Sequence, residues 1–118
     1  MKKTIKLMAD YGCYPLWWVG SDVAGAVDPA ELPLQPDTLQ RLKQWSLVYD
    51  ATLNQNYPPD SGFASKADAQ AFDREGMQLW RQLADELAPT YDVLYFSEPR
   101  GQLLVHPDQG AEVSSFAN

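Results

Sequence analysis

Cys13 and His106 are the residues of this sequence that could form a nucleophilic pair. The chain has one cysteine and one histidine, so a thiol activated by an imidazole would require these two side chains to meet. The alternative is a buried cysteine and a solvated histidine, which is the commoner situation and the one that we expect. A single cysteine and a single histidine also exclude an internal disulfide and the usual Cys/His metal sites.

Asp10 and Glu98 are the second possible source of chemistry. Each follows a predicted strand, so parallel pairing would place both carboxylates at the carboxyl edge, where open α/β sheets bind ligands. There they could hold a divalent cation or perform acid–base catalysis. The alternative is a pair of solvated loop carboxylates. The sequence has no glycine-rich phosphate loop, CxxC, HExxH or serine-elbow motif, and we expect no catalytic residues, no metal and no cofactor.

Five predicted elements would position these groups. Apolar residues recur at intervals of three and four over two segments, which predicts two amphipathic helices. Proline is tolerated at the first position of a helix, so the first helix begins near Pro36, and it ends near Asn54. Ser65 resembles a helix cap and Pro89 stops a helix, which bounds the second helix at about 65–88. Strands are predicted at 4–9, 91–97 and 102–106, the last two as a hairpin.

The element order β-α-α-β-β predicts an α/β fold. A two-helix crossover makes the first two strands parallel, and the hairpin adds an antiparallel strand. We expect a small two-layer sandwich in which both helices pack on one face of a three- to four-stranded mixed sheet. Residues 1–106 are predicted as a single domain with a long irregular loop at 12–36, within which 16–19 could pair as an extra strand. Residues 107–118 are expected to form a weakly ordered tail.

The second helix has a glycine in its interior. Gly76 destabilises a helix by about 1 kcal/mol relative to alanine, so we expect another part of the chain to approach it closely. The backbone of the first helix is the most economical candidate. The acidic residues of the second helix are expected mainly on a solvated face; they are Asp68, Asp73, Glu75, Asp85 and Glu86.

The overall charge of the chain is strongly negative. Its 118 residues have a formal net charge of −7, which argues against a nucleic-acid surface. Lys6 and Asp10 leave only three consecutive apolar residues near the N-terminus, too few for an export signal, and no stretch approaches transmembrane length. We therefore expect a cytoplasmic protein with no membrane partner.

The segment from Leu7 to Gln40 contains acidic residues but no base. It also contains Tyr11 and three further aromatic residues, and this combination is typical of a surface that captures a basic protein. The alternative is that the aromatic residues cap the sheet while the acids keep the protein soluble. The predicted partner-binding residues are Tyr14, Trp17 and Trp18 as anchors, with Asp22, Asp28 and Glu31 as the steering carboxylates.

Several short motifs span most of the chain. They are Ala9-Asp10-Tyr11-Gly12-Cys13-Tyr14-Pro15-Leu16-Trp17, Leu32-Pro33-Leu34, Trp45 with Tyr49-Asp50-Ala51-Thr52-Leu53-Asn54, Ser61-Gly62-Phe63, and Glu75-Gly76 with Leu79-Trp80. Over residues 7–98 the chain thereby resembles a family of small acidic bacterial proteins. Some of these resemble immunity proteins of polymorphic toxin and contact-dependent growth inhibition systems. The resemblance implies that the chain binds and neutralises a cognate toxin domain, frequently a nuclease, and it implies no catalytic residues.

Charge and resemblance lead to the same expected function. A toxin that acts on nucleic acid usually carries a basic groove, which an acidic protein can occupy or border. We therefore expect an immunity protein, not an enzyme, that binds a cognate toxin, a basic nuclease, through its acidic and aromatic surface. The alternative is a small metal-assisted enzyme that uses Asp10 and Glu98. A third possibility is a subunit of a larger complex.

Overall fold

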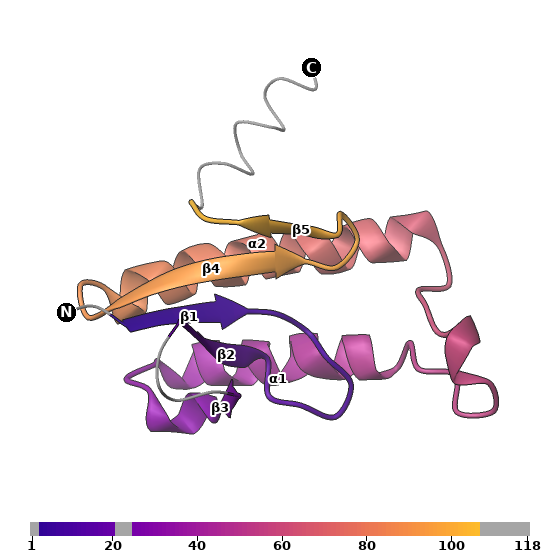
Figure 1. The fold of residues 1–118 in the computed structure, drawn as a ribbon, viewed down its shortest axis with the longest axis horizontal. Helices are drawn as coiled ribbons and strands as arrows, with labels where there is room; N and C mark the ends of the chain where they lie inside the picture. Colours follow the sequence, from indigo (N-terminus) through magenta and orange to yellow (C-terminus); the bar gives the residue numbers. More distant parts are fainter. Residues whose placement is uncertain (1–2, 21–24, 107–118) are drawn as a thin grey trace, which may run out of the picture.

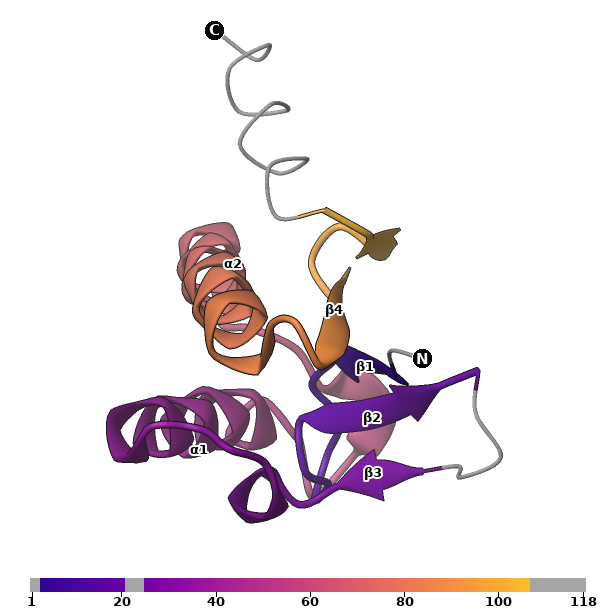
Figure 2. The ribbon, with the colours of Figure 1, turned by 90° about the vertical axis from the view of Figure 1, so that its left-hand side faces the viewer.

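Two helices pack together on one face of a five-stranded sheet (Figures 1 and 2). The computed structural model describes residues 3–20 and 25–106. Along the sheet the strands follow the order β3-β2-β1-β4-β5. The strands are β1 (Lys3–Leu7), β2 (Leu16–Val19), β3 (Ala26–Val27), β4 (Tyr91–Ser97) and β5 (Gln102–Leu104), and the helices are α1 (Pro36–Asp50) and α2 (Lys66–Leu87). This arrangement confirms the predicted two-layer α/β architecture.

The sheet differs from the prediction in its number of strands. The possible extra strand at 16–19 forms as β2, but the segment predicted as an irregular loop also holds β3 and a 3₁₀ turn at Pro29–Glu31. β3 pairs only Ala26 and Val27 with β2. Two residues leave no recognisable alternation in a sequence, so five strands form where three or four are predicted.

β1 and β4 are parallel neighbours, as the two-helix crossover predicts. Ile5 lies opposite Val93 and Leu7 opposite Tyr95, and all four side chains are buried on the face that the helices cover. The carboxyl ends of β1 and β4 therefore lie at the same edge of the sheet. That edge receives the chain segments that form the candidate site.

α2 follows its sequence signals closely. The hydroxyl oxygen of Ser65 accepts the backbone N–H of Asp68 at 3.1 Å, and the helix stops before Pro89. α1 ends at Asp50 rather than near Asn54, because the chain turns there and the Thr52 hydroxyl donates to a backbone carbonyl of the last helical turn. None of the helices within 3–20 and 25–106 is long and apolar enough to cross a membrane.

Gly76 lies where α2 meets both β4 and α1. A Cβ atom at this position would lie 2.8 Å from Cζ of Tyr95 and 3.0 Å from Cζ2 of Trp45, and closer still to the Tyr95 hydroxyl. The predicted close approach is therefore present, and α1 takes part in it as predicted, but through the Trp45 side chain and not through its backbone, while the nearest atoms belong to the Tyr95 side chain of β4. Both rings belong to the buried core, beside Trp80, whose indole N–H donates to the Val93 carbonyl at 2.7 Å.

The helices leave the other face of the sheet uncovered (Figure 2). On that face Trp17 of β2 lies opposite Lys6 of β1, and Lys6 lies opposite Leu94 of β4. All three side chains are half-buried. Because side chains alternate along a strand, this face carries the residues that do not enter the core.

Candidate functional site

The loop after β1 folds back onto the carboxyl end of α1. The ring of Tyr11 stacks on the ring of Tyr49, with their centroids 4.5 Å apart and their planes 20° from parallel. The hydroxyls of Tyr11 and Thr52 share a hydrogen bond of 2.7 Å, and the backbone N–H of Gly12 donates to the Asp50 carboxylate at 3.1 Å. Gly12 has a φ of +69°, a left-handed conformation that glycine adopts readily. These contacts fix the loop on the helix.

Glu98 joins the same cluster from the end of β4. Its carboxylate accepts a hydrogen bond of 2.9 Å from the Tyr49 hydroxyl. Burial raises the pKa of Tyr49, and the hydrogen bond to Glu98 and its negative charge raise it further. Asp10, which follows β1, accepts the backbone N–H of Tyr11 at 2.8 Å. Parallel pairing of β1 with β4 thus brings Asp10 and Glu98 to one edge of the sheet, as predicted.

Tyr14 and Asp28 extend this cluster toward β3. The Tyr14 hydroxyl donates to Asp28 at 3.4 Å, and 51% of Tyr14 is exposed. Asp28 also caps the 3₁₀ turn, because its carboxylate accepts the backbone N–H of Ala30 at 3.0 Å. Glu31, at the end of that turn, is exposed. Of the four predicted residues in this region, three lie together, and Asp22 lies outside the described residues.

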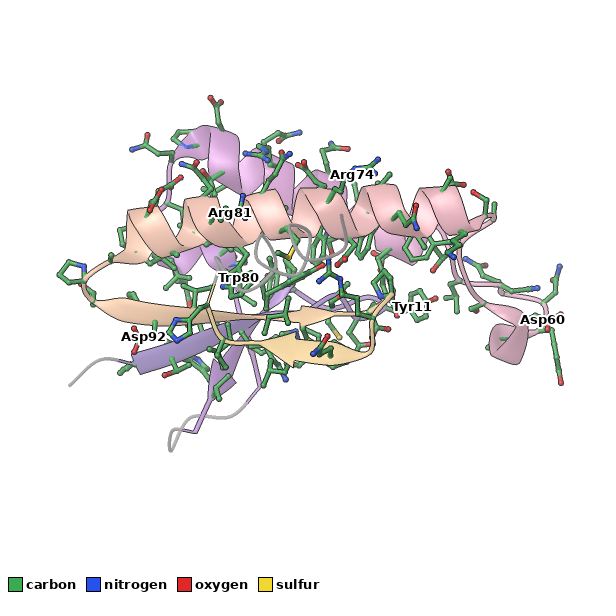
Figure 3. The ribbon with its side chains drawn as sticks, turned by 90° about the horizontal axis from the view of Figure 1, so that it is seen from above. Tyr11, Asp60, Arg74, Trp80, Arg81 and Asp92 are labelled. Atoms are coloured by element: carbon green, nitrogen blue, oxygen red, sulfur yellow. The ribbon has the colours of Figure 1, made fainter. Side chains whose placement is uncertain are left out.

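We call the resulting region the acidic tyrosine surface; it comprises Asp10, Tyr11, Tyr14, Asp28, Tyr49, Asp50 and Glu98. Within the described residues, none of its four carboxylates forms an ion pair. Figure 3 shows Tyr11 at the end of the molecule nearest the projecting loop that carries Asp60, while Asp92 lies at the opposite end. That loop also exposes Tyr57, at 57%, and residues 54–62 include no Lys or Arg. Negative charge and tyrosine rings therefore gather at one end.

The two tryptophans of β2 lie on opposite faces of the sheet. The Trp18 ring packs against the core on the helix-covered face, 6.4 Å from the ring of Tyr91, and the Lys3 ammonium group is 5.4 Å from its centroid. Trp17 lies on the uncovered face, and its indole N–H donates to the Met8 carbonyl at 2.9 Å. Both rings are half-buried, so each contributes to packing while keeping some exposed surface.

Cys13 and His106 lie at opposite ends of the sheet. Cys13 is beside α1, where its carbonyl accepts the Ser46 hydroxyl at 3.5 Å and its thiol donates to the Tyr11 carbonyl. His106 follows β5, which runs antiparallel to β4, so it lies near Tyr91 at the start of β4. Within residues 3–20 and 25–106 there is no group of three or more His, Cys, Asp or Glu side chains that could hold a metal ion.

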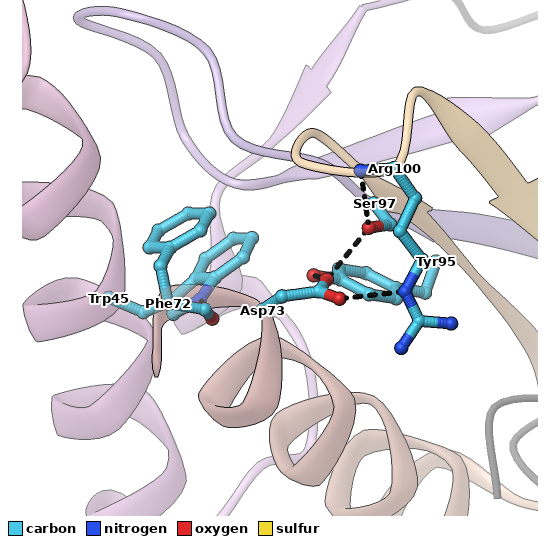
Figure 4. A network of polar contacts seen from close by, with 6 residues as sticks. All are labelled: Trp45, Phe72, Asp73, Tyr95, Ser97 and Arg100. Carbon is cyan, nitrogen blue, oxygen red and sulfur yellow. Dashed lines mark hydrogen bonds and ion pairs between the residues drawn. The ribbon is translucent and has the colours of Figure 1, made fainter. Parts of the chain in front are cut away.

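A buried carboxylate on α2 holds the end of β4 and the turn after it (Figure 4). Asp73 is 6% exposed, so its predicted place on a solvated face was wrong. Its Oδ1 accepts the hydroxyls of Tyr95 at 2.6 Å and Ser97 at 2.7 Å, and its Oδ2 accepts Nε of Arg100 at 2.9 Å. Burial, together with the bond to Asp73, raises the pKa of Tyr95. The available signal was the spacing, because Asp73 precedes Gly76 by three residues on the face toward β4.

Glu86 is a half-buried carboxylate on α2 that caps the neighbouring helix α1. The N-cap residue of α1, Gln35, makes no side-chain cap of its own. Instead, the Glu86 carboxylate accepts the Gln35 backbone N–H at 2.7 Å and the Thr38 hydroxyl, and Gln82 donates a third hydrogen bond at 2.6 Å. Burial would raise the pKa of Glu86, but these hydrogen bonds outweigh it and lower the pKa. Glu86, a residue of α2, thus caps the N-terminus of α1.

A groove of about 600 Å³ lies between α1, α2 and the loop that joins them. Trp45 and Phe72, whose rings stack with centroids 4.5 Å apart, line its apolar part. At its rim Arg41 forms an ion pair of 3.1 Å with Glu75. Thr52 lines the groove and also binds Tyr11, so the groove borders the acidic tyrosine surface.

The fold and this surface are those of a small acidic α/β protein with one strongly charged end. The chain belongs to the Serratia CdiI immunity protein-like family, whose model matches residues 3–98. A search of curated proteins found no match. Membership confirms the resemblance to immunity proteins. Because an immunity protein is not an enzyme, it also favours a binding role over the metal-assisted enzyme considered for Asp10 and Glu98.

Proposed function

We propose that this chain binds a cognate toxin domain through the acidic tyrosine surface and thereby neutralises it. The supporting observation is that Asp10, Asp28, Asp50 and Glu98 gather at one end without ion-pair partners among the described residues. Negative potential on one side of a protein speeds its encounter with a basic partner. The partially exposed ring of Tyr14 lies within this charged region and can become buried in a complex.

The partner that fits this surface is a basic nuclease domain in the cytoplasm. Nucleases contact the phosphate backbone through Lys and Arg side chains, which a carboxylate-rich surface can occupy in place of the substrate. Asp28 and Glu31 supply the negative charge of this part of the proposed interface, Tyr14 supplies an aromatic ring, and Asp22 belongs to the same segment. Trp17 would border the interface from the uncovered sheet face.

The test is the association rate of the purified chain with its cognate toxin domain. Glu31→Lys should slow association about tenfold at low salt and reduce its salt dependence, because Glu31 is exposed and lies beside Asp28. Asp85→Lys is the matched control, since Asp85 is an exposed carboxylate on α2 and should change the rate much less. Equal slowing by both variants would mean that net charge, and not this surface, steers the complex.

The aromatic anchors are tested by dissociation. Tyr14→Ala should speed dissociation about tenfold or more while leaving the thermal stability of the free chain nearly unchanged, because half of Tyr14 is exposed. Trp17→Ala should also speed dissociation. Trp18→Ala should mainly destabilise the free chain, because its ring packs against the core. A toxin complex that dissociates at the wild-type rate in the Tyr14 and Trp17 variants would place the interface elsewhere.

A further inference from the structure

A cationic pocket lies next to the acidic tyrosine surface, on the other side of the turn after β4. It is a hollow of about 500 Å³ between the start of α2 and that turn. Its cationic lining residues are Lys66, Arg74 and Arg100, and its one carboxylate is Asp73. Three cationic residues around one pocket contrast with the net charge of the whole chain, which is −7.

Asp73 holds the Arg100 guanidinium in a defined orientation. Nε of Arg100 donates to Asp73 at 2.9 Å, and the Arg100 backbone N–H donates to the Ser97 hydroxyl, which itself binds Asp73. The two terminal nitrogens of Arg100 have no acceptor within the part of the chain that the structure describes, and Figure 4 shows them turned away from the carboxylate. An arginine fixed through Nε presents these two nitrogens as a ready-made fork of N–H donors.

The charge of Asp73 does not neutralise the pocket. Its carboxylate is shared by Arg100 and two hydroxyls, and it is buried beneath the pocket. Lys66 and Arg74 are exposed, and neither forms an ion pair with a described residue. The pocket therefore keeps a net positive charge that is available to a ligand.

We propose that this pocket binds a carboxylate, namely an Asp or Glu side chain that the toxin presents beside its basic patch. The planar carboxylate matches the two parallel N–H groups of the Arg100 fork. The identity of the occupant rests on the proposed function, whereas the preference of the pocket for a carboxylate does not. Arg100, which supplies the fork, lies beyond residue 98, where the family match ends, whereas Lys66, Asp73 and Arg74 lie within it.

The neighbouring surface gives the pocket a role in specificity. Glu98 and Arg100 belong to one turn, in which the Gly101 backbone N–H donates to the Glu98 carbonyl at 3.2 Å. Negative charge therefore changes to positive charge within two residues of the turn. A partner must present the opposite signs in the matching order, and a uniformly basic toxin would meet like charge at Arg100.

The first experiment uses the isolated chain. The ¹⁵N resonance of Arg100 Nε is followed during titration with acetyl-glutamate amide, and separately with inorganic phosphate, at constant ionic strength. We expect saturable binding of the carboxylate that Arg74→Gln and Lys66→Gln each weaken about fivefold. Arg81→Gln, an exposed arginine two turns further along α2 and outside the pocket, is the control and should bind as the wild type does (Figure 3).

Two results would overturn the proposal that this pocket binds a carboxylate. A shift that does not saturate, or that Arg81→Gln weakens as much as Arg74→Gln does, would show nonspecific charge screening. Saturable binding of phosphate without binding of the carboxylate would overturn the assignment of the ligand. Both results are independent of any toxin, so they are distinct from a failure of the proposed function.

The second experiment uses the complex with the toxin domain. Arg100→Lys keeps a positive charge beside Asp73 but loses the fork, and it should speed dissociation about tenfold. Thermal unfolding of the free variant shows whether the fold is retained, and Arg74→Gln, on the exposed side of the pocket, provides a second variant. Wild-type dissociation of both variants would exclude a toxin carboxylate as the occupant, even where Glu31→Lys slows association as the proposed function requires.

Discussion

The ring of Tyr11 stacks on the ring of Tyr49, so the loop after β1 meets the last turn of α1 through two nearly parallel aromatic rings. The loop carries Asp10, and the helix end carries Asp50, which receives the Gly12 backbone N–H. The stack therefore determines how these carboxylates lie relative to one another. Because Tyr49 packs against the core, the stack ties this part of the acidic tyrosine surface to the packing of the fold.

Two substitutions of Tyr11 distinguish the stability contributed by the ring stack from that contributed by the hydrogen bond to Thr52. Tyr11→Leu removes both and should lower the free energy of unfolding by about 1–3 kcal/mol. Tyr11→Phe keeps the ring and should lower it by about 1 kcal/mol or less. Urea unfolding measures both values. An equal loss in the two variants would mean that the hydrogen bond, and not the stack, holds the loop.

Glu86→Gln tests the cap that α2 provides for α1. The charged cap should contribute about 1 kcal/mol at neutral pH. Because the pKa of Glu86 is lowered in the folded state, this contribution is present above the unfolded-state value of 4.5 and is lost as the pH falls through the folded-state pKa. Urea unfolding from pH 7 to pH 3 should therefore show a smaller acid-dependent loss in the variant. Asp85→Asn, at an exposed neighbouring position, is the control and should change the free energy of unfolding at pH 7 by less than about 0.5 kcal/mol.

Gly76→Ala tests the close contact between α2 and Tyr95. Alanine would favour the helix by about 1 kcal/mol, but its Cβ would lie 2.8 Å from a fully buried ring carbon, and overpacking of this kind costs about 1–3 kcal/mol. We expect a net loss of stability in thermal unfolding. Gln78→Ala, at an exposed position of the same helix, is the control and should change the unfolding free energy by less than about 0.5 kcal/mol. A Gly76→Ala protein as stable as the wild type would show that the core around Tyr95 rearranges to accept the added methyl group.

Tyr95→Phe tests the buried hydrogen bond to Asp73. At pH 7 the variant should lose about 1–2 kcal/mol, since Asp73 retains Ser97 and Arg100 as donors. The pKa of Tyr95 is raised in the folded state, so its contribution is complete below the unfolded-state value of 10.0 and declines above it, by up to about 1.4 kcal/mol per pH unit. The stabilities of the wild type and the variant should therefore converge between pH 10 and pH 11. Parallel curves over that range would contradict a raised pKa at Tyr95.

Local signals were sufficient for most of the secondary structure. The cap at Ser65 and the stop at Pro89 bound α2, and the run of strand-favouring residues at 91–97, rich in Val, Tyr and Phe, indicates β4. β3 could not be predicted, because Ala26 and Val27 form a strand only through their pairing with β2. Neighbouring structure, and not local sequence, makes that segment a strand.

The negative charge of the site could be predicted from the sequence, but the contacts among its residues could not. The absence of bases between residues 7 and 40 indicated an acidic region, and the structure groups Tyr14 with Asp28. The contributions of Asp50, Tyr49 and Glu98 depend on contacts between residues far apart in the chain, which no local pattern specifies. Asp73 is an exception to the expected solvated face of α2, and only the donors from β4 and the turn after it explain its burial.

The Asp73 network also links two short patterns in the chain. On α2 an aspartate precedes a glycine by three positions, and on β4 a tyrosine precedes a serine by two. Without Tyr95 and Ser97, the buried Asp73 carboxylate would have too few hydrogen-bond donors. A larger residue at Gly76 would displace Tyr95, which supplies one of those donors. We therefore expect relatives with this architecture to have all four of the residues Asp73, Gly76, Tyr95 and Ser97 or none of them. The four positions thus form a short signature that can be sought in other sequences.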